Sequence, residues 1–240
     1  MGALPLRLGR PLLAGSARQR AGVVLVCCAV LVVALGMVFA HQARADRLDR
    51  AIDSPVITWL DGHPGLAARL AMPGSMVPAV ALSGALVIAC LLAGRLNGAL
   101  LAAAAVPAAA GLNDALLKHL VHRTYLGVLS YPSGHTATMF ALAATGAVLL
   151  LAPPQGTRTR IVRVLLSAGA CALGGLVAVG VIGLRWHYFT DTVAGAAVGI
   201  GTVCGLALLL DLTVVRRLIG RVCRQPPTAE ERRDQPKVRA

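Results

Sequence analysis

The chain has 240 residues, of which 57% are hydrophobic and only 14% are charged, and its mean hydropathy is +0.73. A soluble domain carries about 25% charged residues. Several apolar runs here are long enough to cross a bilayer, so we predict a polytopic helical membrane protein. Nucleic-acid-binding proteins also carry charges such as the net +13 of this chain. Here, however, the arginines cluster beside apolar runs, where they set topology. We therefore expect membrane lipids as partners and no nucleic acid.

The N-terminal residues 1–20 are basic and precede an apolar run at 21–40. A cleaved signal peptide has a similar pattern, with Val38-Phe39-Ala40 as its cleavage site. However, the apolar core of a signal peptide has about 7–15 residues, and this run is longer. We predict a basic cytoplasmic N-terminus followed by an uncleaved first span.

Residues 41–76 are polar and mixed in charge. Apolar residues recur at helical spacing on either side of Pro55, namely Leu48 and Ile52, then Val56, Trp59 and Leu60. One interpretation is a set of short helices at the membrane surface, with Trp59 at the level of the lipid headgroups. A solvated loop is equally compatible with this pattern.

The remaining apolar runs follow at about 77–94, 99–117, 134–152, 164–184 and 188–212. With the first run they predict an all-α fold, a six-helix transmembrane bundle over residues 21–212. In the last run, Gly195-x-x-x-Gly199 and Gly201-x-x-x-Gly205 predict close helix packing. Residues 213–240 form a basic tail that we expect to be disordered.

An even number of spans places both termini on the same side, and most of the basic residues lie on that side. The positive-inside rule therefore predicts that both termini are cytoplasmic in a multi-pass protein of the plasma (inner) membrane. The residues able to carry chemistry then gather at the outer face. They are three cations, two histidines, a carboxylate and a Ser-Gly turn: Lys118, Arg123, Arg185, His135, His187, Asp191 and Ser133-Gly134.

Ionisable residues beside membrane spans are functional candidates by default. Cations together with the free amides of a helix N-terminus form an anion site, most naturally for phosphate. His187 and Asp191 are four residues apart, so on a helix they share a face and can hydrogen-bond. A carboxylate behind an imidazole fixes its tautomer and raises its nucleophilicity. His135 can then serve as general acid. The residues predict phosphoryl transfer at the outer face on a membrane-embedded substrate. Asp114 is expected to pair with Lys118 or to cap a buried polar cluster.

These residues resemble the motifs of the type 2 phosphatidic acid phosphatase (lipid phosphate phosphatase) superfamily. Pro132-Ser133-Gly134-His135 matches the second motif of that family completely. Lys118 matches the lysine of the first motif, and His187 with Asp191 matches the His-x-x-x-Asp of the third. The resemblance covers roughly residues 77–212.

The resemblance implies a role for each matched residue. His187 attacks phosphorus and forms a phosphohistidine, Asp191 orients it, and His135 protonates the departing oxygen. Lys118 and the Ser133-Gly134 turn hold the phosphoryl oxygens. No metal and no other cofactor is expected in this family.

Two arginines depart from the family pattern. The Arg-Pro of the first motif would fall at Tyr125-Leu126, and the nearest arginine is Arg123. The Ser-Arg of the third motif would fall at Gly180-Val181, and the nearest arginine is Arg185. We predict that both arginines reach the phosphate from these new positions. The alternative is a weakened site, because losing one such donor costs about 10²–10³ in rate.

The expected function is therefore a metal-independent membrane lipid phosphatase. Its substrate would be a polyprenyl pyrophosphate, phosphatidic acid or phosphatidylglycerophosphate. One alternative is a lipid phosphotransferase, which would use the same site with an acceptor other than water. Another is a catalytically inactive scaffold or binding protein of the same fold. The sequence predicts no particular oligomeric state.

Overall fold

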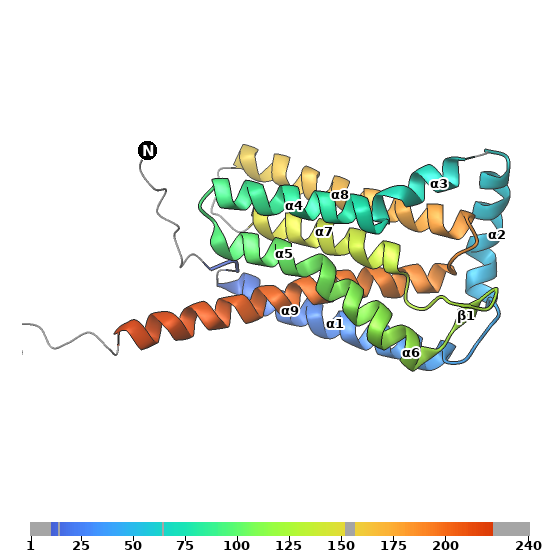
Figure 1. Ribbon diagram of the computed structural model, residues 1–240, viewed down its shortest axis with the longest axis horizontal. Helices are drawn as coiled ribbons and strands as arrows, with labels where there is room; N and C mark the ends of the chain where they lie inside the picture. The colour runs from blue at the N-terminus through green and yellow to red at the C-terminus, as the bar shows by residue number, and fades with distance from the viewer. Residues whose placement is uncertain (1–10, 14, 64, 152–156, 223–240) are drawn as a thin grey trace, which may run out of the picture.

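The computed structural model describes residues 11–13, 15–63, 65–151 and 157–222, and most of them are helical (Figure 1). In chain order the elements are α1 (Ser16–Phe39), α2 (Arg47–Asp61), α3 (Leu66–Ala71), the 3₁₀ turn η1 (Met72–Gly74), α4 (Met76–Leu92), α5 (Leu96–Gly111), the π-helical turn η2 (Leu112–Leu117), α6 (Lys118–Val121), β1 (Thr124–Tyr125), β2 (Val128–Leu129), α7 (Gly134–Leu151), α8 (Thr157–Gly183) and α9 (Phe189–Val222). The two short strands pair in an antiparallel hairpin.

Among the described residues, five helices are long and apolar enough to cross a membrane: Ser16–Phe39, Leu96–Val121, Gly134–Leu151, Thr159–Gly183 and Phe189–Leu212. A sixth span is obtained when Leu66–Gly74 and Met76–Leu92, which meet at a 45° bend, are counted as one. The predicted all-α polytopic membrane fold is thereby confirmed. Each of the six predicted runs corresponds to one long helix.

The helix ends differ from the predicted ones. α8 begins at Thr157 and α9 continues to Val222. Residues 213–222 of the predicted tail are therefore helical, because a helix can carry charged residues past the end of an apolar run. Residues 1–10 and 223–240, which belong to the two predicted basic ends, lie outside the described residues.

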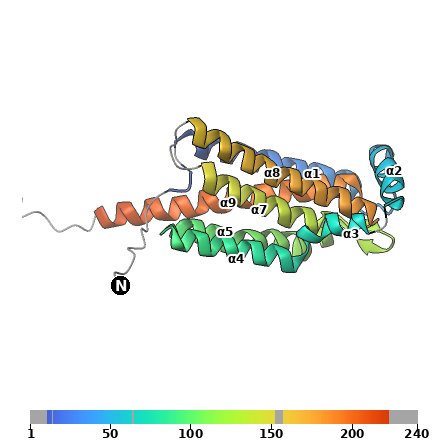
Figure 2. The same ribbon diagram turned by 90° about the horizontal axis from the view of Figure 1, so that it is seen from above.

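The long helices lie side by side in three layers (Figure 2). α7 and α9 form the middle layer, α1 and α8 lie on one side of it, and α4 and α5 lie on the other. α7 contacts both α8 and α9, and α1 packs against α9. The helix that begins with the predicted phosphate-binding turn is thus the central one.

Glycines on α9 allow its backbone to contact the backbone of α7 directly. A Cβ added at Gly195 would overlap the carbonyl oxygen of Ser133, and one added at Gly199 would overlap that of Ala137. Because backbone atoms cannot move aside as a flexible side chain can, these positions require glycine. The interpretation of Gly195-x-x-x-Gly199 as a packing motif is confirmed.

Residues 41–76 form helices, which favours the first of the two interpretations of this segment. α2 is one helix that continues through Pro55, and it crosses the end of the bundle (Figure 1). α3 then runs back along α8, so closely that a Cβ at Gly180 would overlap the backbone of Ala71. The end of the bundle that α2 crosses is opposite to the end where α9 finishes.

Candidate active site

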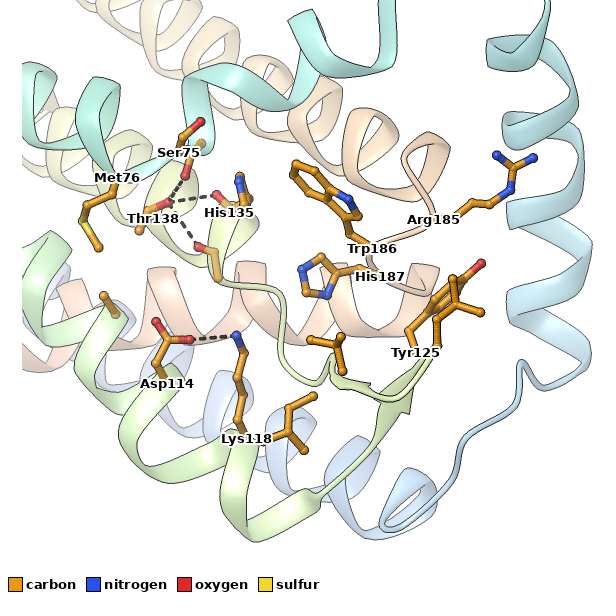
Figure 3. A pocket seen from close by; sticks show the side chains of 16 residues that line it. Ser75, Met76, Asp114, Lys118, Tyr125, His135, Thr138, Arg185, Trp186 and His187 are labelled. Atoms are coloured by element: carbon orange, nitrogen blue, oxygen red, sulfur yellow. Dashed lines mark hydrogen bonds and ion pairs between the residues drawn. The ribbon is translucent and has the colours of Figure 1, made fainter.

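A cavity of about 660 Å³ lies near the end of the bundle that α2 crosses (Figure 3). Its wall is built by the η1–α4 bend, the end of the α5–α6 span, the β1–β2 hairpin, the first turns of α7 and the loop before α9. The lining residues are Gly74, Ser75, Met76, Ala110, Asp114, Lys118, Tyr125, Leu126, Val128, Leu129, Gly134, His135, Thr138, Arg185, Trp186 and His187. Basic and apolar side chains share one wall, which suits an amphiphilic anion.

His187 lies in the loop before α9, and only 8% of the residue is exposed. Its Nδ1 is 2.8 Å from the backbone carbonyl oxygen of Ser130, an atom that can only accept a hydrogen bond. Nδ1 therefore carries the ring proton and donates it, which leaves a lone pair on Nε2. Sequence reasoning missed Ser130 because a backbone acceptor has no signature among side chains.

The charge of His187 is controlled by burial. Burial, the largest cause, lowers the pKa of His187 to about 3; the bond to Ser130 opposes this shift, and the charges of Lys118 and His135 add to it. The ring is therefore neutral, and hence nucleophilic, throughout the physiological pH range. A histidine in an unfolded chain has a pKa of about 6.5. The folded chain thus binds fewer protons between these two values, and this group lowers the free energy of unfolding as pH falls through that window.

We expect the His187 ring resonances of isotopically labelled protein to show no titration between about pH 8 and pH 5, where an unfolded histidine takes up its proton. The measurement is a nuclear magnetic resonance titration in detergent, with the resonance assigned by its absence in His187→Gln. The chemically unfolded chain serves as the control. A midpoint near that of the unfolded chain would contradict the structure.

His135 is the second residue of α7, and its ring centroid is 5.3 Å from that of Trp186. Thr138, one turn later, places its hydroxyl oxygen 2.9 Å from the carbonyl oxygen of Gly74, to which it can donate. A Cβ at Gly74 would clash with the carbonyl oxygen of His135. The η1–α4 bend therefore holds the first turn of α7, and with it His135, at the cavity wall.

Lys118 begins α6, and its Nζ is 2.9 Å from Oδ1 of Asp114, as predicted. Both residues lie at the π-helical turn of the α5–α6 span, an irregularity that is frequent at functional sites. Oδ1 of Asp114 also accepts a 3.0 Å hydrogen bond from Nδ2 of Asn113. An anion in the cavity would compete with Asp114 for the lysine.

Ser133 and Gly134 take different positions. The Ser133 hydroxyl oxygen accepts from the hydroxyl of Thr136 at 2.9 Å, and the Ser133 amide donates to the carbonyl oxygen of Asp191 at 3.0 Å. Ser133 is fully buried and is not part of the cavity wall, whereas Gly134 is. The structure therefore brings only the glycine of the predicted turn to the cavity.

Arg123 lies outside the cavity. It is fully buried, and its Nη1 donates to Oδ1 of Asp191 and to the hydroxyl of Thr190, both at 2.7 Å, while its Nη2 donates to Asp49. Two aromatic rings flank the guanidinium at 4.1 and 4.3 Å, those of Phe39 and Tyr188. The prediction that Arg123 binds phosphate is therefore corrected. Its charge is taken by two buried carboxylates.

Asp191 also differs from its predicted role. Its Oδ1 accepts from Arg123, and its Oδ2 accepts from the amide of Tyr188 at 3.1 Å. The distance from Oδ2 to Nδ1 of His187 is 4.0 Å, which is too long for a hydrogen bond. The predicted bond between Asp191 and His187 is replaced by the bond to Ser130. Asp191 instead holds the start of α9, close after His187, through its bond with the amide of Tyr188.

Arg185 lines the rim of the cavity, where its backbone has a left-handed φ of +58°. Its Nη2 is 2.7 Å from Oδ2 of Asp61, the last residue of α2. In Figure 3 the side chain points toward α2 and away from His187. Both partners are about half exposed, so the ion pair is weak and easily exchanged.

A family model for the PAP2 superfamily matches residues 115–213. The matched region includes Lys118, Gly134, His135 and His187, which the structure brings to one cavity. This region of the chain is therefore similar to the PAP2 superfamily. No curated protein and no solved structure matches the chain. Members of the PAP2 superfamily are generally phosphatases, so the match indicates phosphoester hydrolysis as the class of reaction.

The candidate site of this chain differs from the motifs of the PAP2 superfamily in its arginines. Tyr125 stands where the first-motif arginine would fall, and it lines the cavity with its ring 4.4 Å from that of Tyr188. Two cations that line the described cavity, Lys118 and Arg185, are each paired with a carboxylate. A bound phosphate would therefore compete with Asp114 for Lys118 and with Asp61 for Arg185.

Proposed function

We propose that this protein, which matches the PAP2 superfamily over residues 115–213, is a membrane lipid phosphatase. It would hydrolyse a lipid phosphomonoester or pyrophosphate without a metal, through a phosphohistidine at His187. The observation that carries the proposal is the protonation and hydrogen bonding of the His187 ring. Its ring is neutral, its Nδ1 proton is held by Ser130, and it lines the same cavity as His135 and Lys118. The residues proposed as nucleophile, acid and phosphate-binding cation thus line one cavity.

In the proposed first step, Nε2 of His187 forms a bond to phosphorus while the bond from phosphorus to the leaving oxygen breaks. His135 gives its proton to that oxygen. The phosphorylated ring keeps its proton on Nδ1 and becomes positively charged, and the carboxylate of Asp191, 4.0 Å away, stabilises that charge. In the second step His135 accepts a proton from water as the water attacks phosphorus. Phosphate leaves and His187 is regenerated.

Lys118 and the first amides of α7 hold the phosphoryl oxygens in this proposal, since a helix N-terminus favours anions. Apolar residues at the mouth of the cavity would contact the lipid chain, and the most exposed are Leu126, Val128 and Met76. The distribution of basic residues supports a location in the plasma (inner) membrane with both termini in the cytoplasm. The cavity would then open on the extracytoplasmic side.

The test is phosphate release by purified protein in detergent micelles containing polyprenyl pyrophosphate, phosphatidic acid or phosphatidylglycerophosphate. A water-soluble phosphomonoester, from which we expect slower release, measures the contribution of the lipid chain, and a chelator is the control for a metal. We expect chelator-resistant release from at least one lipid. Folded protein that is silent on every substrate would contradict the proposal and favour a non-catalytic membrane protein. Release that requires an added hydroxyl acceptor would indicate a phosphotransferase.

The Arg185–Asp61 pair predicts a variant that binds substrate better. In Asp61→Asn the guanidinium loses its competing carboxylate and becomes available to the phosphate. We expect KM for the lipid phosphate to fall by up to about fivefold, the equivalent of an exposed ion pair. Asp61→Glu keeps the charge and is the matched control. The difference in KM between Asp61→Asn and the wild type should shrink at high salt because exposed charges are screened. An unchanged KM would show that Arg185 does not contact the phosphate.

A further inference from the structure

The N-terminus of α9, which follows His187 directly, is capped by another helix. The amide of Phe189 donates to Oδ1 of Asp53 at 3.1 Å, and the amide of Thr190 donates to Oδ1 of Asp49 at 3.0 Å. These are the first amides of α9, which have no acceptor within their own helix. Carboxylates are the favoured partners there because they also complement the helix dipole. Both carboxylates come from α2.

Asp49 makes further contacts in the same place. Its Oδ1 accepts from the hydroxyl of Thr190 at 2.9 Å, and its Oδ2 accepts from Arg123. The carbonyl oxygen of Arg123 accepts from the amide of Ser130 at 2.9 Å, and the carbonyl oxygen of Ser130 holds Nδ1 of His187. Asp49 is thus connected to His187 on two sides, through α9 and through the segment that carries Ser130.

Asp49 and Asp53 lie where carboxylates are unfavourable unless donors face them. Asp49 and Asp53 are four residues apart on α2, and like charges at that spacing destabilise an isolated helix. Both are buried, Asp49 completely. Buried carboxylates persist only where donors face them, and here the donors are Arg123 and the start of α9. α2 lies outside residues 115–213, so the PAP2 match does not contain this support.

We propose that Asp49 is a positioning residue for the nucleophile: it fixes His187 by capping α9 and by anchoring Arg123 beside Ser130. The inference rests on the proposed phosphatase function for its effect on rate. In Asp49→Asn the amide oxygen can still accept from Thr190, but an amide group replaces the charge that Arg123 requires. Because a displacement of about 1 Å can cost about 10²-fold in rate, we expect kcat to fall by that order.

The experiment compares the full-length wild type with Asp49→Asn, Thr190→Val and Asp46→Asn. Asp46→Asn is the matched control, since Asp46 caps α2 itself, does not touch α9, and asparagine caps nearly as well. Thr190→Val removes a hydroxyl that contacts both Asp49 and Arg123 while leaving every charge paired, so it tests the inference if Asp49→Asn does not fold. The measurements are kcat and KM for phosphate release, and amide hydrogen exchange of residues 188–192 by mass spectrometry.

For Asp49→Asn, and to a smaller extent for Thr190→Val, we expect a lower kcat with KM within about threefold of wild type, because the phosphate contacts remain. Exchange at residues 188–192 should be about tenfold faster, as expected for a lost cap. Asp46→Asn should match the wild type in kcat and in the exchange rate of residues 188–192. Unchanged exchange overturns the inference whatever the activity, and so does an unchanged kcat in an active enzyme. If the wild type itself releases no phosphate, the phosphatase proposal fails, and exchange alone decides the role of Asp49.

Discussion

Replacing His187 with alanine should reduce phosphate release by about 10⁴-fold or more, because the loss of a covalent nucleophile removes the whole reaction path. The effect should appear in kcat, since Lys118 and Gly134, the residues proposed to bind the phosphate, are untouched. The variant should fold, because the hydrogen bond that it loses joins His187 only to the carbonyl oxygen of Ser130. Micellar substrate and a phosphate assay provide the measurement.

The intermediate provides a second check of the same prediction. Wild type quenched during turnover of radiolabelled substrate should carry an acid-labile, alkali-stable label, as a phosphohistidine does. His187→Ala should carry none. His63→Ala, which changes an exposed histidine on the segment between α2 and α3, is the control and should retain both label and activity. Label on the His187→Ala protein would contradict the assignment of the nucleophile.

Replacing His135 with asparagine should lower the first-turnover rate on a lipid phosphomonoester by about 10²–10⁴-fold, the usual contribution of a general acid. The loss should be far smaller with p-nitrophenyl phosphate, whose leaving group departs without a proton. The measurement is rapid-quench release of the two alcohols. A stoichiometric burst of p-nitrophenol followed by slow turnover is expected, because in the proposed mechanism His135 is also the base of the second step.

The way in which activity depends on the leaving group distinguishes the proposed roles of His187 and His135. His187→Ala should be inactive on both substrates, whereas His135→Asn should be inactive mainly on the poor leaving group. Equal losses of His135→Asn on both substrates would show that His135 does not donate the proton. His135 would then be better described as a residue that holds the phosphate.

The fold was predictable from the sequence because a bilayer demands continuous apolar runs, and six such runs gave the long helices. The helix ends were less predictable. Arg160 and Arg163 lie inside α8, although the apolar run begins after them. A helix can extend beyond the hydrocarbon layer, so hydropathy measures the apolar length and not the helix. The hairpin at Thr124–Leu129 is too short to leave a pattern.

The candidate site was predictable where side-chain chemistry points to it and unpredictable elsewhere. His135, His187, Lys118, Gly134 and Arg185 all reach the cavity wall. Arg123 does not, because its partner Asp49 is 74 residues away and only the folded chain brings them together. A signal was present nonetheless. The chain has ten acidic residues, and two of them, Asp49 and Asp53, repel each other at helical spacing unless buried donors oppose them.

The glycine contacts between α7 and α9 constrain how the protein can move. Backbone meets backbone at Gly195 and Gly199, so sliding or separating the two helices would break a contact that has no flexible side chains to absorb the change. His135 is the second residue of α7, and His187 lies two residues before the first residue of α9. The two histidines are therefore held at a constant distance from each other by the rigid α7–α9 pair. Any motion that admits substrate or releases product would then occur in the segments around this pair, namely the β1–β2 hairpin and the loop that carries Arg185. Rate-limiting product release would then respond to substitutions at Leu126 or Arg185 and not to substitutions between the helices.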